Sequence, residues 1–210
     1  MRNVEIKARI SSIGEIQGKL AGMGVADPTS RLAQVDTYFD VPDGRMKLRE
    51  FVDDQHAASE LIFYKRANDS GAKLSEYEIV EVQDPDATKQ LLSAALGVKA
   101  IVEKQRHLYM LGRTRVHLDE VKDLGSFLEI EVVLAEGEPL TDGEAEARSI
   151  MKDLDINAGD LVSDSYSDLM IDQAASEIRK GVECGLADTI AGRVYTVEEL
   201  LEEEEKGRRA

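Results

Sequence analysis

Eight segments of this 210-residue sequence alternate between apolar and polar residues. In the first of them, Val4, Ile6 and Ala8 occupy one side, whereas Glu5 and Lys7 occupy the other. Successive side chains of a β-strand point to opposite faces, so a period of two predicts a strand with one apolar and one polar face. The predicted strands span residues 3–10, 31–40, 45–53, 60–66, 73–82, 98–111, 113–121 and 126–135.

Helix-capping residues predict three helices between and after these strands. Ser12 lies three residues before Glu15, which is the spacing of a capping box. Asp84 followed by Pro85 supplies a cap and a first-turn proline for a second helix. Thr141, with an acidic residue three positions later, predicts a third start of the capping-box kind. The predicted helices span residues 13–23, 85–96 and 141–154, and residues 165–171 form a short closing element.

The order of these elements predicts an α+β fold. Strands do not alternate regularly with helices, so the sheet is expected to be mainly antiparallel. Eight antiparallel strands can close into a barrel with an interior of ligand size, flanked here by the helices. The simpler alternative is an open sheet with one wetted face, which is the usual form of a half-buried antiparallel sheet.

The composition excludes several classes of protein. The formal net charge of −16 at pH 7 opposes nonspecific binding to the phosphates of nucleic acid. No apolar run is long enough to span a membrane, and the charged start of the sequence differs from a signal peptide. The single cysteine, Cys184, cannot form an internal disulfide, which favours a cytoplasmic location.

The polar faces of the predicted strands carry an unusual number of charges. Carboxylates gather on the first and last strands, as Glu5, Glu129 and Glu131, whereas the middle strands carry mostly Lys and Arg. Cationic side chains bind phosphate through short charge-assisted hydrogen bonds, and clustered carboxylates suit a hard divalent cation such as Mg²⁺ or Mn²⁺. Both sets together indicate chemistry on a polyphosphate.

Five blocks of sequence, in this order, resemble a CYTH domain, the triphosphate tunnel metalloenzyme superfamily. The blocks are Val4–Lys7, Gln34–Asp40, Met46–Glu50, Val116–Val121 and Phe127–Glu131. The chain is most similar to the class IV adenylate cyclase-like branch. The resemblance covers residues 1–172 and implies an eight-stranded tunnel barrel; residues 173–210 form an acidic helical tail.

The resemblance also implies roles for particular residues. The family's first-strand motif, Glu-x-Glu-x-Lys, is changed at Asn3, which keeps an oxygen donor but brings no negative charge. The implied ligands of Mg²⁺ or Mn²⁺ are Glu5, Glu76, Asp119, Glu129 and Glu131. The implied triphosphate-binding residues are Lys7, Lys47, Arg49, Arg66, Lys73, Lys104, Arg106 and Arg115.

From these residues we expect a divalent-metal-dependent enzyme that hydrolyses a phosphoanhydride bond of a small triphosphate. Tripolyphosphate, thiamine triphosphate and nucleoside triphosphates are the candidate substrates. Two alternatives stay open: an adenylate cyclase that forms cyclic AMP and diphosphate from ATP, and a non-catalytic module that binds polyphosphate or nucleotide. His117 shares a face with Arg115 and Asp119, where it lines the tunnel, packs or lies at the surface; the three histidines are not spaced as a zinc set.

The tail supports a separate expectation. Residues 185–188 and 191–199 are similar to the C-terminal segment of some bacterial toxin–antitoxin antidotes. That similarity implies a protein partner or a homodimer formed through the tail. The alternative is a solvated acidic appendage or packing arm.

Overall fold

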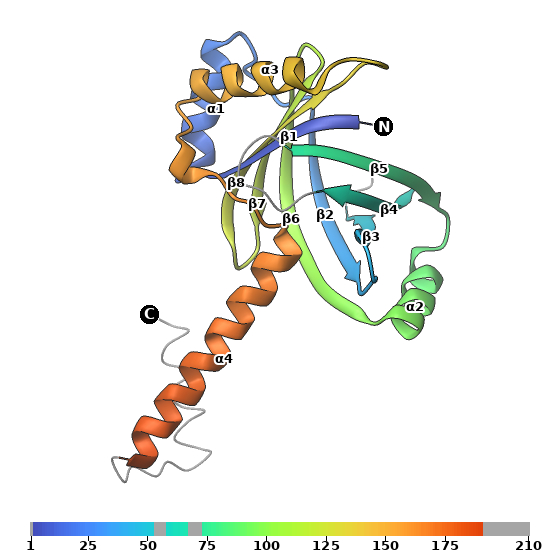
Figure 1. Ribbon diagram of the computed structural model, residues 1–210, viewed down its shortest axis with the longest axis vertical. Helices are drawn as coiled ribbons and strands as arrows, with labels where there is room; N and C mark the ends of the chain where they lie inside the picture. Colours follow the sequence, from blue (N-terminus) through green and yellow to red (C-terminus); the bar gives the residue numbers. More distant parts are fainter. Residues whose placement is uncertain (1, 53–57, 67–72, 191–210) are drawn as a thin grey trace. The chain divides into compact units, whose positions relative to one another are not determined.

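The computed structural model describes residues 2–52, 58–66 and 73–190, and contains the eight predicted strands (Figure 1). The strands are β1 (Arg2–Arg9), β2 (Ser30–Phe39), β3 (Arg45–Phe51), β4 (Ser59–Arg66), β5 (Lys73–Val82), β6 (Val98–Leu111), β7 (Thr114–Val121) and β8 (Gly125–Val133). The helices are α1 (Ile13–Gly22), α2 (Pro85–Leu96), α3 (Leu140–Asp153), the short 3₁₀ helix η1 (Ala158–Asp160) and α4 (Tyr166–Ile190).

The eight strands form a closed antiparallel barrel, so the predicted fold class is confirmed. Around the barrel the strands follow the order β1-β5-β4-β3-β2-β6-β7-β8. The barrel closes because β1 pairs with β5 on one side and with β8 on the other. Since the sheet has no open edge, its two faces become an inside and an outside.

The apolar face of the sheet points outward, against helices. The outward residues of β1, β7 and β8 form one hydrophobic core with Ile16 and Leu20 of α1 and with Ala147 and Ile150 of α3. In Figure 1, α1 and α3 lie together against this side of the barrel. Burying the apolar faces under helices leaves the polar faces of the strands for the interior.

The predicted starts of α1 and α2 are confirmed, but the predicted start of α3 is wrong. Ser12 Oγ accepts a hydrogen bond from the backbone N–H of Glu15 at 3.4 Å, and Asp84 Oδ1 accepts one from Ala87 at 3.0 Å. Helix α3 instead begins after Pro139, so Thr141 lies inside the first turn rather than at the cap. Proline has a φ angle that suits entry into a helix, and here it begins the helix two residues earlier than the hydroxyl pattern predicts.

The chain comprises two compact units, residues 1–170 and residues 171–210. The first unit holds the barrel, α1–α3 and the first residues of α4. The predicted closing element at residues 165–171 is therefore the beginning of a longer helix. In the second unit α4 continues to Ile190, with exposed apolar side chains at Ile178, Val182 and Leu186.

Among the described residues, no helix combines the length and the apolar character that crossing a bilayer requires.

Candidate functional site

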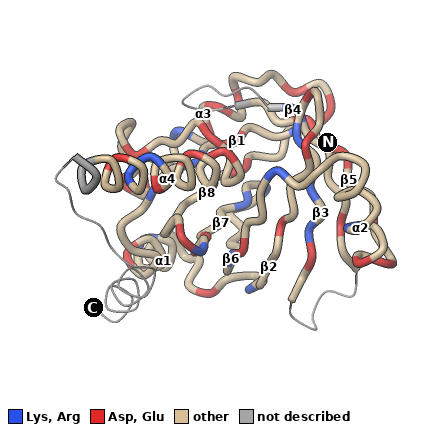
Figure 2. Tube along the Cα trace, turned by 90° about the horizontal axis from the view of Figure 1, so that it is seen from below, with Lys and Arg blue, Asp and Glu red and all other residues tan. Residues whose placement is uncertain are grey.

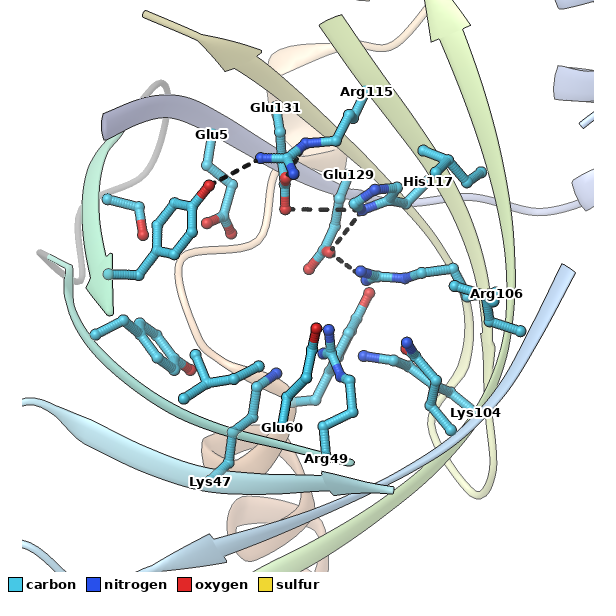
Figure 3. Close-up of a pocket in the computed structure, with 18 of the residues that line it drawn as sticks. Glu5, Lys47, Arg49, Glu60, Lys104, Arg106, Arg115, His117, Glu129 and Glu131 are labelled. Carbon is cyan, nitrogen blue, oxygen red and sulfur yellow. Dashed lines mark hydrogen bonds and ion pairs between the residues drawn. The ribbon is translucent and has the colours of Figure 1, made fainter. Parts of the chain in front are cut away.

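The interior of the barrel is a cavity of about 370 Å³ lined by residues from all eight strands. Its walls follow the period of two: residues 3, 5 and 7 of β1, for example, and residues 104, 106 and 108 of β6. Figure 2 shows acidic and basic positions on the strands that ring this space, and Figure 3 shows many of these side chains pointing into it. The charged faces predicted from sequence thus converge on this cavity.

One wall gathers three cationic side chains around a single buried carboxylate. Asp36 of β2 accepts hydrogen bonds from Lys47 Nζ at 2.8 Å, from Arg49 Nε and Nη2 at 2.8 and 2.9 Å, and from Lys104 Nζ at 3.2 Å. Asp36 is fully buried, and Lys47, Arg49 and Lys104 line the cavity in front of it. Asp36 fixes the positions of three cations while neutralising only one of them.

The crowding of these cations is reflected in their pKa values. Burial and the nearby charge of Arg49 lower the pKa of Lys47 to about 7, although Asp36 opposes the shift. Burial and Arg106 likewise lower the pKa of Lys104 to about 8. For Asp36, burial favours the neutral acid, but the charges of Arg49, Lys104 and Lys47 outweigh it and hold the pKa well below its usual range. The low pKa values of Lys47 and Lys104 thus follow from burial and from the crowding of cations on this wall.

The opposite wall carries the carboxylates of β1 and β8. Glu129 forms ion pairs with Lys7, at 3.2 Å, and with Arg106. Glu131 pairs with Arg115 Nε at 3.1 Å. Burial would raise the pKa of Glu129, but Lys7 and Arg106 hold it well below its usual range, so this group stays ionised at neutral pH.

Asp119 lies behind the cavity wall and does not join the other predicted metal ligands. Both of its carboxylate oxygens accept hydrogen bonds from Arg106, and Oδ2 also accepts one from the hydroxyl of Tyr166 at 2.9 Å. Asp119 is fully buried, and it holds Arg106 in place instead of facing the cavity. As with Asp36, a carboxylate behind the wall orients a cation in front of it.

Three donor groups on β7 and β8 can hold a metal ion. Ligand atoms of His117, Glu129 and Glu131 all lie within 4.8 Å of one another. His117 Nδ1 is buried, lies 3.7 Å from an oxygen of each glutamate, and has no hydrogen-bond partner among the described residues. Two carboxylates and an unpartnered imidazole nitrogen suit a divalent cation, so this side of the cavity fits the metal that the sequence predicts.

The structure brings most of the predicted residues together. Nine of them line the cavity: Lys7, Lys47, Arg49, Lys104, Arg106, Arg115, Glu5, Glu129 and Glu131. Glu76 is a correction: its side chain is exposed and lies off the cavity, because Ser75, Tyr77 and Ile79 are the residues of β5 that point inward. Arg66 and Lys73 belong to β4 and β5, but their side chains lie outside the described part of the structure.

Sequence reasoning missed three residues of the site. Asp36 shares the inward face of β2 with Gln34 and Tyr38, so the alternation within residues 31–40 could have placed it inside. Glu60, on the polar face of β4, could have been found in the same way. Tyr166 follows the barrel at the start of a helix, where no periodic pattern predicts that its ring faces Lys7 at 3.8 Å.

Fold and site together define a class of protein: closed β-barrels with an apolar exterior covered by helices and a charged, ligand-sized interior. The family model for the CYTH domain matches residues 1–166. The chain therefore belongs to the CYTH domain family. Comparison with the curated proteins finds no match.

Solved structures share this fold. The PH1012 protein from Pyrococcus horikoshii has a TM-score of 0.70 at 23% identity, over 80% of this chain and 98% of its own. A putative adenylate cyclase from Vibrio parahaemolyticus has a TM-score of 0.66 at 16% identity, over 80% and 97%. The putative adenylyl cyclase HpAC1 from Hippeastrum, described as having a dominant triphosphatase activity, has a TM-score of 0.55 at 15% identity, over 94% and 99%.

Proposed function

We propose that the protein is a divalent-metal-dependent triphosphatase, which binds a small triphosphate inside the barrel and hydrolyses a phosphoanhydride bond. The observation that carries this proposal is the division of the cavity into two walls. Lys47, Arg49 and Lys104 gather on one wall, and Glu129 and Glu131 lie on the other (Figure 3). A triphosphate with a divalent cation needs both kinds of surface, since the cationic groups bind phosphate oxygens and the carboxylates bind the metal.

The cationic wall binds the phosphate chain. Arg49 and Arg106 are each held by a buried aspartate, so their guanidinium groups are oriented before substrate arrives. Burial and the neighbouring cations make the charged forms of Lys47 and Lys104 unfavourable in the free protein. A polyanion placed among these groups relieves that repulsion, and its binding free energy increases accordingly.

The carboxylate wall holds the metal. Glu129 and Glu131, with Glu5 lining the same cavity, are the groups that would bind Mg²⁺ or Mn²⁺. A bound divalent cation supplies charge neutralisation of the phosphoryl oxygens and lowers the pKa of bound water. Because the pKa of Glu129 is held far below neutrality, this residue acts as a permanent anion and not as a proton donor.

Hydrolysis within the barrel also depends on excluding bulk water. The Nζ atoms of Lys7 and Lys104 lie over the Tyr166 ring, at 3.8 and 5.3 Å from its centre. The ring therefore fixes two cations with almost no exposed surface, as expected of groups that stabilise charge in a site of low dielectric constant.

HpAC1 and the Vibrio protein support the choice of substrate class, since the first is described as a triphosphatase and the second as a putative cyclase.

The test is an assay of the purified chain with tripolyphosphate, thiamine triphosphate and ATP, each with Mg²⁺ or Mn²⁺. We expect metal-dependent release of phosphate from at least one of them. Lys104→Met should lower kcat/KM by roughly 10–100-fold, the value of one charge-assisted contact to phosphate. Lys122→Met is the matched control, because Lys122 is exposed and pairs with Glu103 outside the cavity. Formation of cyclic AMP, or binding without turnover, would contradict hydrolysis and favour a cyclase or a binding module.

A further inference from the structure

Among the described residues that line the cavity, His117 is the one histidine, and it lies beside the two glutamates of β8. It lies directly across from Glu129 in the pairing of β7 with β8. Its side chain is 6% exposed, and dashed lines in Figure 3 connect its ring to Glu129 and to Glu131. The ring nitrogen Nδ1, which faces both carboxylates, has no hydrogen-bond partner within the part of the chain that the structure describes.

The separation of these atoms is informative. Nδ1 lies 3.7 Å from Glu129 Oε2 and 3.7 Å from Glu131 Oε1, which is too long for a hydrogen bond. A lone pair on nitrogen and two carboxylate oxygens repel one another unless a positive charge lies between them. Two ligand atoms that each bind one ion at about 2.1 Å lie roughly 3–4 Å apart, which is the separation found here.

We propose that His117 is a nitrogen ligand of the metal and that it makes the site prefer Mn²⁺ to Mg²⁺. The inference rests on the proposed function, which places a divalent cation at Glu129 and Glu131. Mg²⁺ selects oxygen ligands in near-ideal octahedral geometry and gains little from an imidazole. Mn²⁺ binds carboxylates equally well and stands above Mg²⁺ in its affinity for nitrogen donors, so a mixed set of one imidazole and two carboxylates favours it.

The surroundings of the glutamates strengthen the need for this nitrogen ligand. Lys7 and Arg106 already pair with Glu129, and Arg115 pairs with Glu131, so a metal ion competes with three cations for two carboxylates. Asn3, on the same inward face of β1 as Glu5, adds no negative charge. Coordination by neutral imidazole adds a metal bond without requiring another carboxylate, and Mn²⁺ gains more from it than Mg²⁺ does.

The experiment uses the full-length chain with Mn²⁺ and no substrate. Electron paramagnetic resonance measures the free Mn²⁺ during a titration, and competition with Mg²⁺ gives the ratio of the two dissociation constants. We expect Mn²⁺ to bind at least tenfold more tightly than Mg²⁺. Electron spin echo envelope modulation of the bound Mn²⁺ should show coupling to one ¹⁴N nucleus, which a site made only of carboxylates would lack.

Two histidine variants serve as a matched pair. His117→Gln should abolish the ¹⁴N coupling and lower the Mn²⁺/Mg²⁺ preference by at least tenfold, with affinity for Mg²⁺ changed less than threefold. His107→Gln should leave both unchanged, because His107 is half-exposed on the outside of β6, where it bonds Gln17. Circular dichroism checks that each variant is folded. If His117→Gln does not fold, the ¹⁴N coupling of the unmodified protein decides whether a nitrogen ligand binds Mn²⁺.

Absence of ¹⁴N coupling in bound Mn²⁺, no binding of Mn²⁺, or an unchanged preference in a folded His117→Gln would each overturn the proposal. The inference and the proposed function fail separately. Nitrogen-coupled Mn²⁺ without hydrolysis of any triphosphate would remove the function alone, whereas hydrolysis without nitrogen coupling would remove the inference alone.

Discussion

At the scale of single residues, Asp36 shows how a buried carboxylate prepares a site for an anion. It holds Lys47, Arg49 and Lys104 within hydrogen-bond distance, so their side-chain freedom is lost during folding and not during binding. Burial and the neighbouring Arg49 still lower the pKa of Lys47 to about 7, because one carboxylate only partly offsets them. Asp36 therefore pre-organises the cations without fully compensating their charge.

This arrangement makes binding depend on pH. Below pH 7 Lys47 is protonated in the free protein, whereas above pH 8 it is mostly neutral and must take up a proton to bind phosphate. We expect the affinity for tripolyphosphate to fall by about tenfold between pH 6.5 and 8.5. Isothermal titration calorimetry in buffers of different ionisation enthalpy would measure the affinity and the proton uptake together.

Lys47→Arg is the control for this prediction. Arginine keeps its charge across the whole range, so the affinity of this variant should vary with pH only as Lys104 and the ligand titrate. A wild-type profile that matches the Lys47→Arg profile would contradict the assignment of the pH dependence to Lys47.

Sequence alone could identify most of the inward residues but not their partners. The period of two placed Lys47, Arg49 and Arg106 on polar faces, and these faces do line the cavity. It could not separate a residue that faces the cavity from one that lies beneath another side chain, which is the case of Asp119 under Arg106. The error at Glu76 has a simpler origin, since a shift of one residue in a strand exchanges its two faces.

At the scale of elements, the contact between α3 and β1 depends on a glycine. A Cβ atom built at Gly143 would lie 2.6 Å from Leu134 Cδ2 and 2.8 Å from Val4 Cγ2. The leucine can rotate away, but the β-branched valine is stiff and belongs to the strand that closes the barrel. The helix can approach β1 this closely only because residue 143 has no side chain.

Gly143→Ala should therefore destabilise the protein, although alanine favours helix. Overpacking costs about 1–3 kcal/mol, and the gain in helix propensity, about 1 kcal/mol, offsets part of it. Gly18→Ala is the matched control, since Gly18 lies in α1 with nothing within 4 Å of an added Cβ. It should stabilise by about 0.5–1 kcal/mol. Urea unfolding of both variants measures the difference, and equal effects in the two would contradict the close contact at Gly143.

Local sequence patterns predicted the helices and strands closely, with errors at their ends. Ser12 and Asp84 cap their helices as predicted because their acceptor oxygens can reach the free N–H groups of the first turn. The start of α3 was misplaced because proline at 139 determines the backbone before Thr141 is reached. The role of the tail as a binding arm stays a prediction.

At the scale of the whole molecule, the barrel confines charge where most proteins place apolar residues. Lys47 and Lys104 release protons in the folded state near pH 7 and 8, whereas in an unfolded chain they would hold them to about pH 10.4. Between these values the unfolded state binds more protons, so raising the pH stabilises the folded barrel.

We expect the free energy of unfolding of the ligand-free protein to rise by about 1–2 kcal/mol per pH unit between pH 8 and pH 9.5. Urea unfolding at a series of pH values measures it. Lys104→Met removes one of the two titrating groups and should reduce the slope by about half. A slope that is zero or negative in the unmodified protein would contradict the depressed pKa values.

Closure of the barrel does not follow from local sequence patterns. Eight alternating segments are compatible with an open sheet, and the pairing of β1 with both β5 and β8 joins segments far apart in the chain. Local periodicity carries no information on such pairing. The sorting of carboxylates to the first and last strands indicated it, because those strands turn out to be neighbours.

The pairing of β1 with β8 has a consequence for the synthesis of the protein. Lys7 faces Glu129, and Glu5 faces Glu131, only after the ribosome has released the last strand of the barrel. Until then β1 lacks its partner strand β8, and its charged and apolar faces are both exposed. Pairing between strands so distant in sequence is expected to be slow. A nascent chain that ends before β8 therefore lacks the partner strand of β1 and two of the carboxylates proposed to bind the metal, Glu129 and Glu131.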